Sequence, residues 1–136
     1  MYNKILVPID NSILSSKVLL NAVRFAKDQK AELVILNVEE PKAGAFSTAI
    51  IYNQESMNAD DNPVIKEVKA KLANETIPIQ YKVAAGNAGD CIITASETER
   101  CDLIIIGSHG FTGLSRLFAA SNSVADRADV PVLIIK

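Results

Sequence analysis

The sequence is poor in the residues that build metal centres and disulfide frameworks. Its 136 residues include one histidine, no tryptophan and two cysteines, Cys91 and Cys101, with no Cys-x-x-Cys pair. These counts argue against a structural zinc site, which needs clustered cysteine or histidine ligands. In a reducing compartment two thiols usually act as small buried apolar residues, and a disulfide or redox pair is the alternative.

The sequence also lacks an excess of charges of one sign and lacks long apolar runs. The formal net charge is −2, and acidic and basic residues are interspersed without a basic stripe. This argues against a nucleic-acid partner and against an anionic membrane surface. No apolar run reaches the length of a transmembrane helix. The chain opens Met-Tyr-Asn-Lys and runs directly into a strand-like segment, so we expect no signal peptide and a cytoplasmic location.

Apolar residues are abundant and regularly arranged. They make up 49% of the chain, enough for a proper core in one domain spanning residues 1–136, with no internal repeat or linker. Short runs of Val, Ile and Leu alternate with segments of helical spacing. Residues 39–62 lack periodicity apart from an apolar patch at 49–52, which predicts a long loop. We expect strands at 4–9, 32–38, 77–83, 101–106 and 131–136, and helices after Ser12, from Pro63, over 87–100 and between Gly107 and Pro131.

The central strand segments are apolar on both faces, which is typical of a parallel sheet covered by helices on both sides. We therefore predict an α/β domain with a doubly wound, five-stranded parallel sheet flanked by about four helices. In such sheets ligands bind beyond the carboxyl ends of the strands, where the strand order reverses. The positions to inspect are Asp10, the stretch after Val38, Gly86 and the loop from Gly107.

The loop at residues 107–113, Gly-Ser-His-Gly-Phe-Thr-Gly, follows the most apolar strand and precedes a helical stretch. Glycines allow positive φ and close approach to a ligand, and N–H groups at a helix start can bind an anion. The loop is neither a Walker A loop nor the Gly-x-Gly-x-x-Gly fingerprint. An ordinary strand-to-helix turn is the alternative, but Asp10 at the same end of the sheet favours a binding site.

Five segments of the chain carry a recognisable pattern: residues 4–12 (KILVPIDNS), 35–38 (ILNV), 86–92 (GNAGDCI), 101–110 (CDLIIIGSHG) and 131–136 (PVLIIK). Together they resemble the universal stress protein family. The resemblance implies an adenine-nucleotide alpha-hydrolase-like fold and, in the ATP-binding branch of the family, a site for ATP or a related adenine nucleotide. It spans the chain apart from the predicted loop.

One glycine of the family's phosphate-binding pattern is absent. The pattern is a glycine, two residues, a second glycine, nine residues and then Gly-Ser or Gly-Thr. Gly107 and Gly110 match its first two glycines, but after nine intervening residues the chain has Ala120 and Ser121. A gap would instead place Asn122-Ser123-Val124 on the family's Gly-Ser-Val. Positive φ would strain alanine and suit asparagine better, whereas negative φ would make the methyl of Ala120 harmless.

The resemblance also implies roles for single residues. Asp10 would meet the adenine or ribose end and is the candidate Mg²⁺ ligand, with capping of the first helix as its alternative role. The backbone at Val38 would contact adenine, and the loop from Gly107 would hold ribose and phosphates. Lys82 and Arg116 could reach phosphate or be surface charges, and a loop histidine is the alternative for His109. The candidate nucleotide-binding residues are Pro8, Ile9, Asp10, Val38, Gly107, His109, Gly110, Ser121, Asn122 and Ser123.

These features favour a nucleotide-binding switch module in stress response over an efficient enzyme. No nucleophile or dedicated catalytic base is evident, so any ATP hydrolysis should be slow. Residues 132–135 would form an apolar edge strand, and with the resemblance this predicts a homodimer through the C-terminal strand. The alternatives are a nucleotide-free dimeric interaction protein of the same fold and an electron-transfer flavoprotein or other small α/β enzyme.

Overall fold

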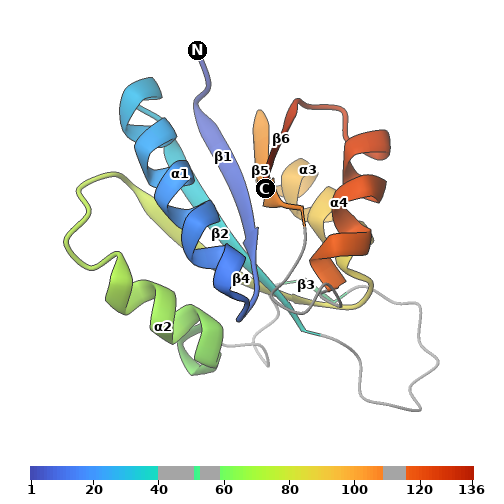
Figure 1. Ribbon diagram of the computed structural model, residues 1–136, viewed down its shortest axis with the longest axis horizontal. Helices are drawn as coiled ribbons and strands as arrows, with labels where there is room; N and C mark the ends of the chain where they lie inside the picture. Colours follow the sequence, from blue (N-terminus) through green and yellow to red (C-terminus); the bar gives the residue numbers. More distant parts are fainter. Residues whose placement is uncertain (40–50, 53–58, 109–115) are drawn as a thin grey trace.

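The computed structural model describes residues 1–39, 51–52, 59–108 and 116–136 (Figure 1). Strands β4, β2, β1, β5 and β6 are neighbours in that order and run parallel, so the predicted five-stranded parallel sheet is confirmed. The elements are β1 (Lys4–Ile9), α1 (Ile13–Gln29), β2 (Glu32–Glu39), β3 (Ile51–Tyr52), the 3₁₀ helix η1 (Ala59–Asp61), α2 (Pro63–Lys71), β4 (Ile79–Ala85), α3 (Ala88–Thr98), β5 (Leu103–Gly107), α4 (Arg116–Arg127) and β6 (Val132–Ile135).

Within residues 39–62, the part that the structure describes contains a strand and a 3₁₀ helix, so the prediction of one long loop is wrong there. Strand β3 adds to the sheet beside β4, and it runs antiparallel, with Ile51 opposite Ala85 and Tyr52 opposite Ala84. Helix η1 lies just before α2 in the chain. A two-residue strand is too short to produce a periodic pattern, because it is stabilised by its partner strand rather than by its own sequence. Residues 40–50 and 53–58 lie outside the described part.

Side chains of the strands alternate between two cores on opposite faces of the sheet. Ile5 and Ile105 belong to the core under α1 and α2, whereas Leu6 and Ile104 belong to the core under α3 and α4. All four are 0% exposed. Burying such a side chain contributes about 1.5–3 kcal/mol each. Figure 1 shows the two helix pairs on either side of the sheet, as the doubly wound prediction requires.

The Asp102 carboxylate connects the starts of β1 and β5 at one edge of the sheet. The two oxygens of Asp102 accept hydrogen bonds from the backbone N–H groups of Asn3 (2.9 Å) and Lys4 (3.1 Å). The N–H of Asp102 donates in return to the carbonyl of Lys4 (2.9 Å). These three bonds join the entry of β1 to the entry of β5, which are 98 residues apart.

Two helices begin at asparagine caps. The Oδ1 atom of Asn62 accepts from the N–H of Ile65 at 3.0 Å, and Pro63 occupies the first turn of α2. In α3, Oδ1 of Asn87 accepts from the N–H of Asp90 at 3.1 Å. An asparagine cap satisfies one of the N–H groups that the first turn leaves unpaired. The helix starts predicted near Pro63 and Asn87 are therefore confirmed.

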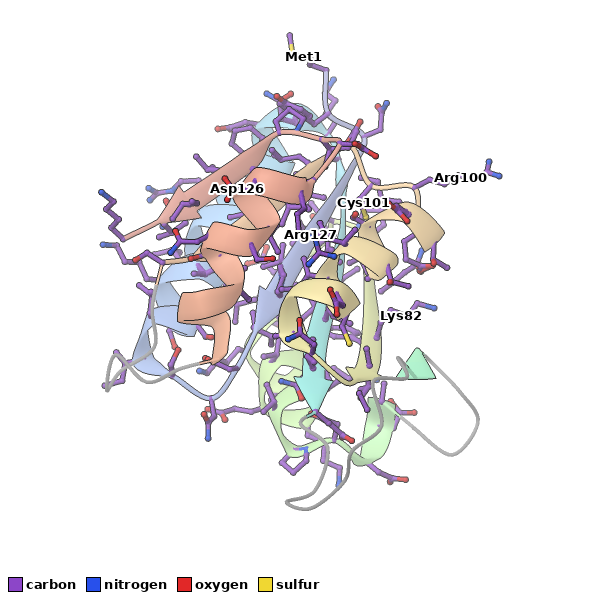
Figure 2. The ribbon with its side chains drawn as sticks, turned by 90° about the vertical axis from the view of Figure 1, so that its right-hand side faces the viewer. Met1, Lys82, Arg100, Cys101, Asp126 and Arg127 are labelled. Atoms are coloured by element: carbon purple, nitrogen blue, oxygen red, sulfur yellow. The ribbon has the colours of Figure 1, made fainter. Side chains whose placement is uncertain are left out.

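Both cysteines are buried thiols rather than a disulfide. Burial raises the pKa of the Cys101 thiol to about 12, and Figure 2 places this residue just beyond α3. A thiol with so high a pKa is protonated at neutral pH and unreactive, which favours the apolar role over a redox pair. In the described segments no helix is long and apolar enough to cross a membrane.

Candidate functional site

The strand order reverses beside β1. Helix α1 connects β1 to β2, which lies on one side of β1. Helix α3 connects β4 to β5, which lies on the other side of β1. Strands β1 and β5 pair only at Ile5–Leu103 and Leu6–Ile104, although both continue for three further residues. The ladder between them therefore stops halfway, beside the strand-order reversal, where doubly wound sheets have the crevice that binds ligands.

A depression open to solvent occupies this crevice. It is small and is formed by the end of β1, the first turns of α1 and the end of β5. Of the predicted site residues, Pro8, Asp10 and Gly107 line it together. The complete lining is Pro8, Asp10, Ser12, Leu14, Ser15, Val18 and Gly107.

The Asp10 carboxylate organises the start of α1. Its Oδ1 atom accepts hydrogen bonds from the N–H of Ser12 (2.8 Å) and from the hydroxyl of Ser15 (2.9 Å). The Ser15 hydroxyl in turn accepts from the N–H of Asp10 at 3.0 Å. Ser12 stands at the predicted N-cap position, but its side chain makes no cap hydrogen bond. Asp10 thus holds the residues at the start of α1 while also lining the depression.

Gly107 permits α1 to approach the end of β5. A Cβ atom built there would lie 3.0 Å from Cδ2 of Leu14 and 3.2 Å from Cγ2 of Val18. Its φ lies outside the left-handed region, in contrast to Gly86 with φ of 137°. Close packing, rather than an unusual backbone conformation, is therefore why glycine stands at position 107.

Ser108 leaves one polar atom unsatisfied at the same edge. Its N–H donates to the carbonyl of Ile135 at 2.8 Å, and its carbonyl lies 3.5 Å from the Ser121 hydroxyl. Its own Oγ is buried and has no hydrogen-bond partner among the described residues. Such an orphaned hydroxyl is unfavourable unless a ligand or water satisfies it.

The candidate residues on α4 point in different directions. Ser121 is buried against Ser108, whereas Asn122 is exposed. The Ser123 hydroxyl accepts from Arg127 at 3.1 Å, and Arg127 also pairs with Asp90 of α3 at 2.8 Å. Figure 2 shows Arg127 between the two helices. Ser123 therefore contributes to the α3–α4 contact, apart from the residues that line the depression.

Ala120 and Asn122, the two candidates for the third-glycine position, both lie in α4 without backbone strain. Ala120 lies within α4, is 4% exposed and packs in the core. Neither Ala120 nor Asn122 has positive φ. A negative φ at position 120 is the case in which alanine adds no backbone strain.

The remaining predicted residues are distributed as follows. Ile9 and Val38 are buried at the ends of β1 and β2. His109, Gly110 and the side chain of Arg116 lie outside the described part of the chain. Lys82 pairs with Glu99 at 3.6 Å, and Glu99 follows the C-terminal end of α3. Lys82 is therefore engaged away from the edge where the depression lies.

Sequence reasoning missed Ser15 and the buried amides of Asn37 and Asn62. The Asn37 side chain donates to the carbonyl of Ile9 at 3.0 Å, and the Asn62 amide donates to Oδ1 of Asn37 at 3.0 Å. One signal was available for Asn37, since it is the single polar residue within an otherwise apolar run. Contacts between residues 25 or more positions apart leave no local pattern that could reveal them.

Known proteins resemble this chain along its whole length. It is 31% identical to the universal stress protein YxiE of Bacillus subtilis over 148 aligned residues, covering 100% of both chains. It is 32% identical to the universal stress protein MJ0577 of Methanocaldococcus jannaschii over 156 aligned residues, covering 100% of this chain and 96% of the relative.

Solved structures share the fold. The universal stress protein UspA from Lactobacillus plantarum superposes with a TM-score of 0.74 at 21% identity, over 99% of this chain and 98% of that one. A universal stress protein in complex with cAMP gives 0.69 at 21% identity, covering 99% and 97%. The universal stress protein from Archaeoglobus fulgidus in complex with dAMP gives 0.60 at 19% identity, covering 99% and 98%.

The family comparison agrees with the geometry. The model of the universal stress protein family matches residues 1–136, which include the crevice between β1 and β5 and both helix pairs. The chain belongs to the universal stress protein family.

Proposed function

We propose that this protein binds ATP or a related adenine nucleotide at the carboxyl edge of its sheet and acts as a cytoplasmic switch module in stress response. The observation that carries the proposal is the depression at the strand-order reversal, where Asp10 and Gly107 meet. The depression is small and open to solvent, unlike the pockets that enclose whole ligands. It suits one part of a nucleotide, with the rest lying along the edge.

Two further observations support a nucleotide. The buried Ser108 hydroxyl needs a partner, and ribose hydroxyls and phosphate oxygens can both supply one. Two structural neighbours are complexes with cAMP and dAMP, and both ligands are adenine nucleotides. The site residues outside the described part, His109 and Gly110, remain members of the proposed site by resemblance.

Asp10 is the proposed contact for Mg²⁺. This ion is commonly held by one or two carboxylates together with substrate phosphates, so a single aspartate beside a nucleotide fits it. Within the described ranges no group of three or more His, Cys, Asp or Glu side chains could hold a metal alone. Asp10 would thus bind the ion only together with the nucleotide, and we propose that any hydrolysis is slow.

A co-purifying nucleotide provides the direct test. We expect mass spectrometry of gently purified protein to detect an adenine nucleotide. Its absorbance should be conspicuous in the ultraviolet spectrum, because the chain lacks tryptophan. Calorimetry with the stripped protein should then show tighter binding of ATP than of adenosine. Stripped protein that binds neither compound would favour the nucleotide-free alternative, and a yellow flavin band would favour the flavoprotein.

We further propose a homodimer through β6, which lies at one edge of the sheet. Leu133 in this strand is 39% exposed, and an exposed apolar edge favours pairing with a second chain. Replacing Leu133 by lysine should convert dimers into monomers in light scattering. Gln80→Lys adds the same charge to an exposed position on β4, towards the other side of the sheet, and should leave the dimer intact. A wild-type protein that is monomeric at high concentration contradicts this assembly.

A further inference from the structure

A chain of amide groups connects the start of α2 to the end of β1. The Asn62 amide nitrogen donates to Oδ1 of Asn37 (3.0 Å) and to Oε1 of Glu39 (2.9 Å). The Asn37 amide nitrogen donates to the carbonyl of Ile9 (3.0 Å). Asn37 and Asn62 are 5% and 6% exposed, so these bonds form where water competes little.

The direction of every bond in this chain is determined at one end. The N–H of Ile65 requires an acceptor, which forces Oδ1 of Asn62 towards α2. The amide nitrogen of Asn62 must then face Asn37, which has to present its oxygen. That orientation leaves the amide nitrogen of Asn37 facing the Ile9 carbonyl. An amide has one donor end and one acceptor end, so neither asparagine can reverse alone without leaving a buried group unpaired.

The Ile9 carbonyl belongs to the peptide unit that carries the N–H of Asp10. That N–H donates to the Ser15 hydroxyl, which donates to the Asp10 carboxylate. Orienting this peptide plane therefore affects the position of the carboxylate that lines the depression. The path from Asn62 to Asp10 consists of consecutive hydrogen bonds and one planar peptide.

We propose that Asn37 and Asn62 are positioning residues for the nucleotide site. Asn62 holds Asn37, and Asn37 holds the Ile9–Asp10 peptide in the orientation that Asp10 needs. This inference rests on the proposed function for its consequence, but its structural part can be tested without nucleotide.

The relay is the hydrogen-bonded path from Asn62 through Asn37 to the Ile9–Asp10 peptide. Replacing Asn62 by aspartate tests it directly. The aspartate can still cap α2 through an oxygen, but it faces Oδ1 of Asn37 with an acceptor. The Asn37 amide must then rotate to donate to residue 62, which leaves an oxygen towards the Ile9 carbonyl. A second variant, Asn62→Ser, keeps a capping hydroxyl, removes the amide and adds no charge. The matched control is Asn87→Asp, which changes the cap of α3 in the same way.

Amide hydrogen exchange of the nucleotide-free protein is the first measurement. The N–H groups of Asp10 and Ser12 should exchange about five- to tenfold faster in both Asn62 variants, the effect of losing one buried hydrogen bond. Exchange in β5 should stay unchanged, which excludes a general loss of stability. Asn87→Asp should leave Asp10 and Ser12 as in the wild type. Wild-type exchange at both amides in both Asn62 variants overturns the relay.

Nucleotide affinity is the second measurement. Because Asp10 is assigned to the adenine or ribose end, ATP and adenosine, measured without Mg²⁺, should each bind about five- to tenfold more weakly to Asn62→Asp. The ratio of the two affinities should match the wild type. A loss confined to ATP contradicts the proposed positioning role. Altered exchange in a protein whose wild type binds no nucleotide would leave the relay standing and refute the proposed function.

Discussion

Replacing Asp10 by alanine should weaken ATP binding at least about tenfold, which corresponds to ~1.4 kcal/mol of binding free energy. The variant loses the acceptor of the Ser12 N–H and of the Ser15 hydroxyl, and both groups line the depression. Hydrogen bonds to a charged group contribute about 1.5–3 kcal/mol, so the free energy of unfolding should also fall. Calorimetry with ATP and urea unfolding measure the two effects.

Two companion variants separate the charge of Asp10 from its role at the helix start. Asp10→Asn keeps an oxygen for Ser12 and Ser15 but removes the charge, so it should bind ATP more weakly than the wild type while losing less stability than Asp10→Ala. Ser15→Ala removes one hydrogen bond and retains the carboxylate, so it should reduce stability more than affinity. Wild-type affinity in Asp10→Ala would remove Asp10 from the site.

Replacing Gly107 by valine should lower the free energy of unfolding by about 2–3 kcal/mol, the cost of overpacking a dense contact. Already the Cβ atom would lie 3.0 Å from Leu14 and 3.2 Å from Val18, and the two methyl groups of valine extend further. Helix α1 must move outward, which displaces the first turn that carries Ser12 and Ser15. We therefore expect reduced ATP affinity together with reduced stability, measured by urea unfolding and calorimetry.

A rescue and a control accompany this substitution. Leu14→Ala removes the side chain nearest to the new Cβ atom, so the pair Gly107→Ala with Leu14→Ala should lose less stability than the sum of the two single variants. In Gly89→Ala the Cβ atom would lie 3.2 Å from the Ser123 hydroxyl. The gain in helix propensity, ~0.5–1 kcal/mol, should offset this contact. A Gly107→Val protein as stable as the wild type would contradict the packing described here.

The fold could be predicted because its strongest determinants are local. Strands β1, β2 and β5 are short runs of Val, Ile and Leu, and their burial on both faces leaves a parallel sheet as the natural solution. Strand β3 could not be predicted, since Ile51 and Tyr52 are a strand only through their pairing with β4. Strand β4 begins two residues later than its alternating pattern suggested, at Ile79 rather than Ile77.

The candidate site divides in the same way. Asp10 and Gly107 could be selected because each follows an apolar strand in a fold whose ligand edge is known in general terms. Ser15 has nothing unusual in its sequence surroundings, and its role depends on how α1 leaves β1. The amides of Asn37 and Asn62 face each other only after α2 has packed on the sheet. Side-chain hydrogen bonds of this kind follow from the folded structure and are not encoded in a short motif.

The hydrogen bonds of Asp102 to the start of β1 affect which parts of this fold can change during evolution. A slip of β1 by one residue would turn every side chain of the strand to the opposite core, and the bonds to Asn3 and Lys4 oppose such a slip. They lie at the edge of the sheet opposite to Asp10 and Gly107. Substitutions at the ligand edge can therefore accumulate in descendant sequences without disturbing the strand register. The edge that maintains the strand register and the edge at which new binding specificity can evolve are separated by the length of the sheet.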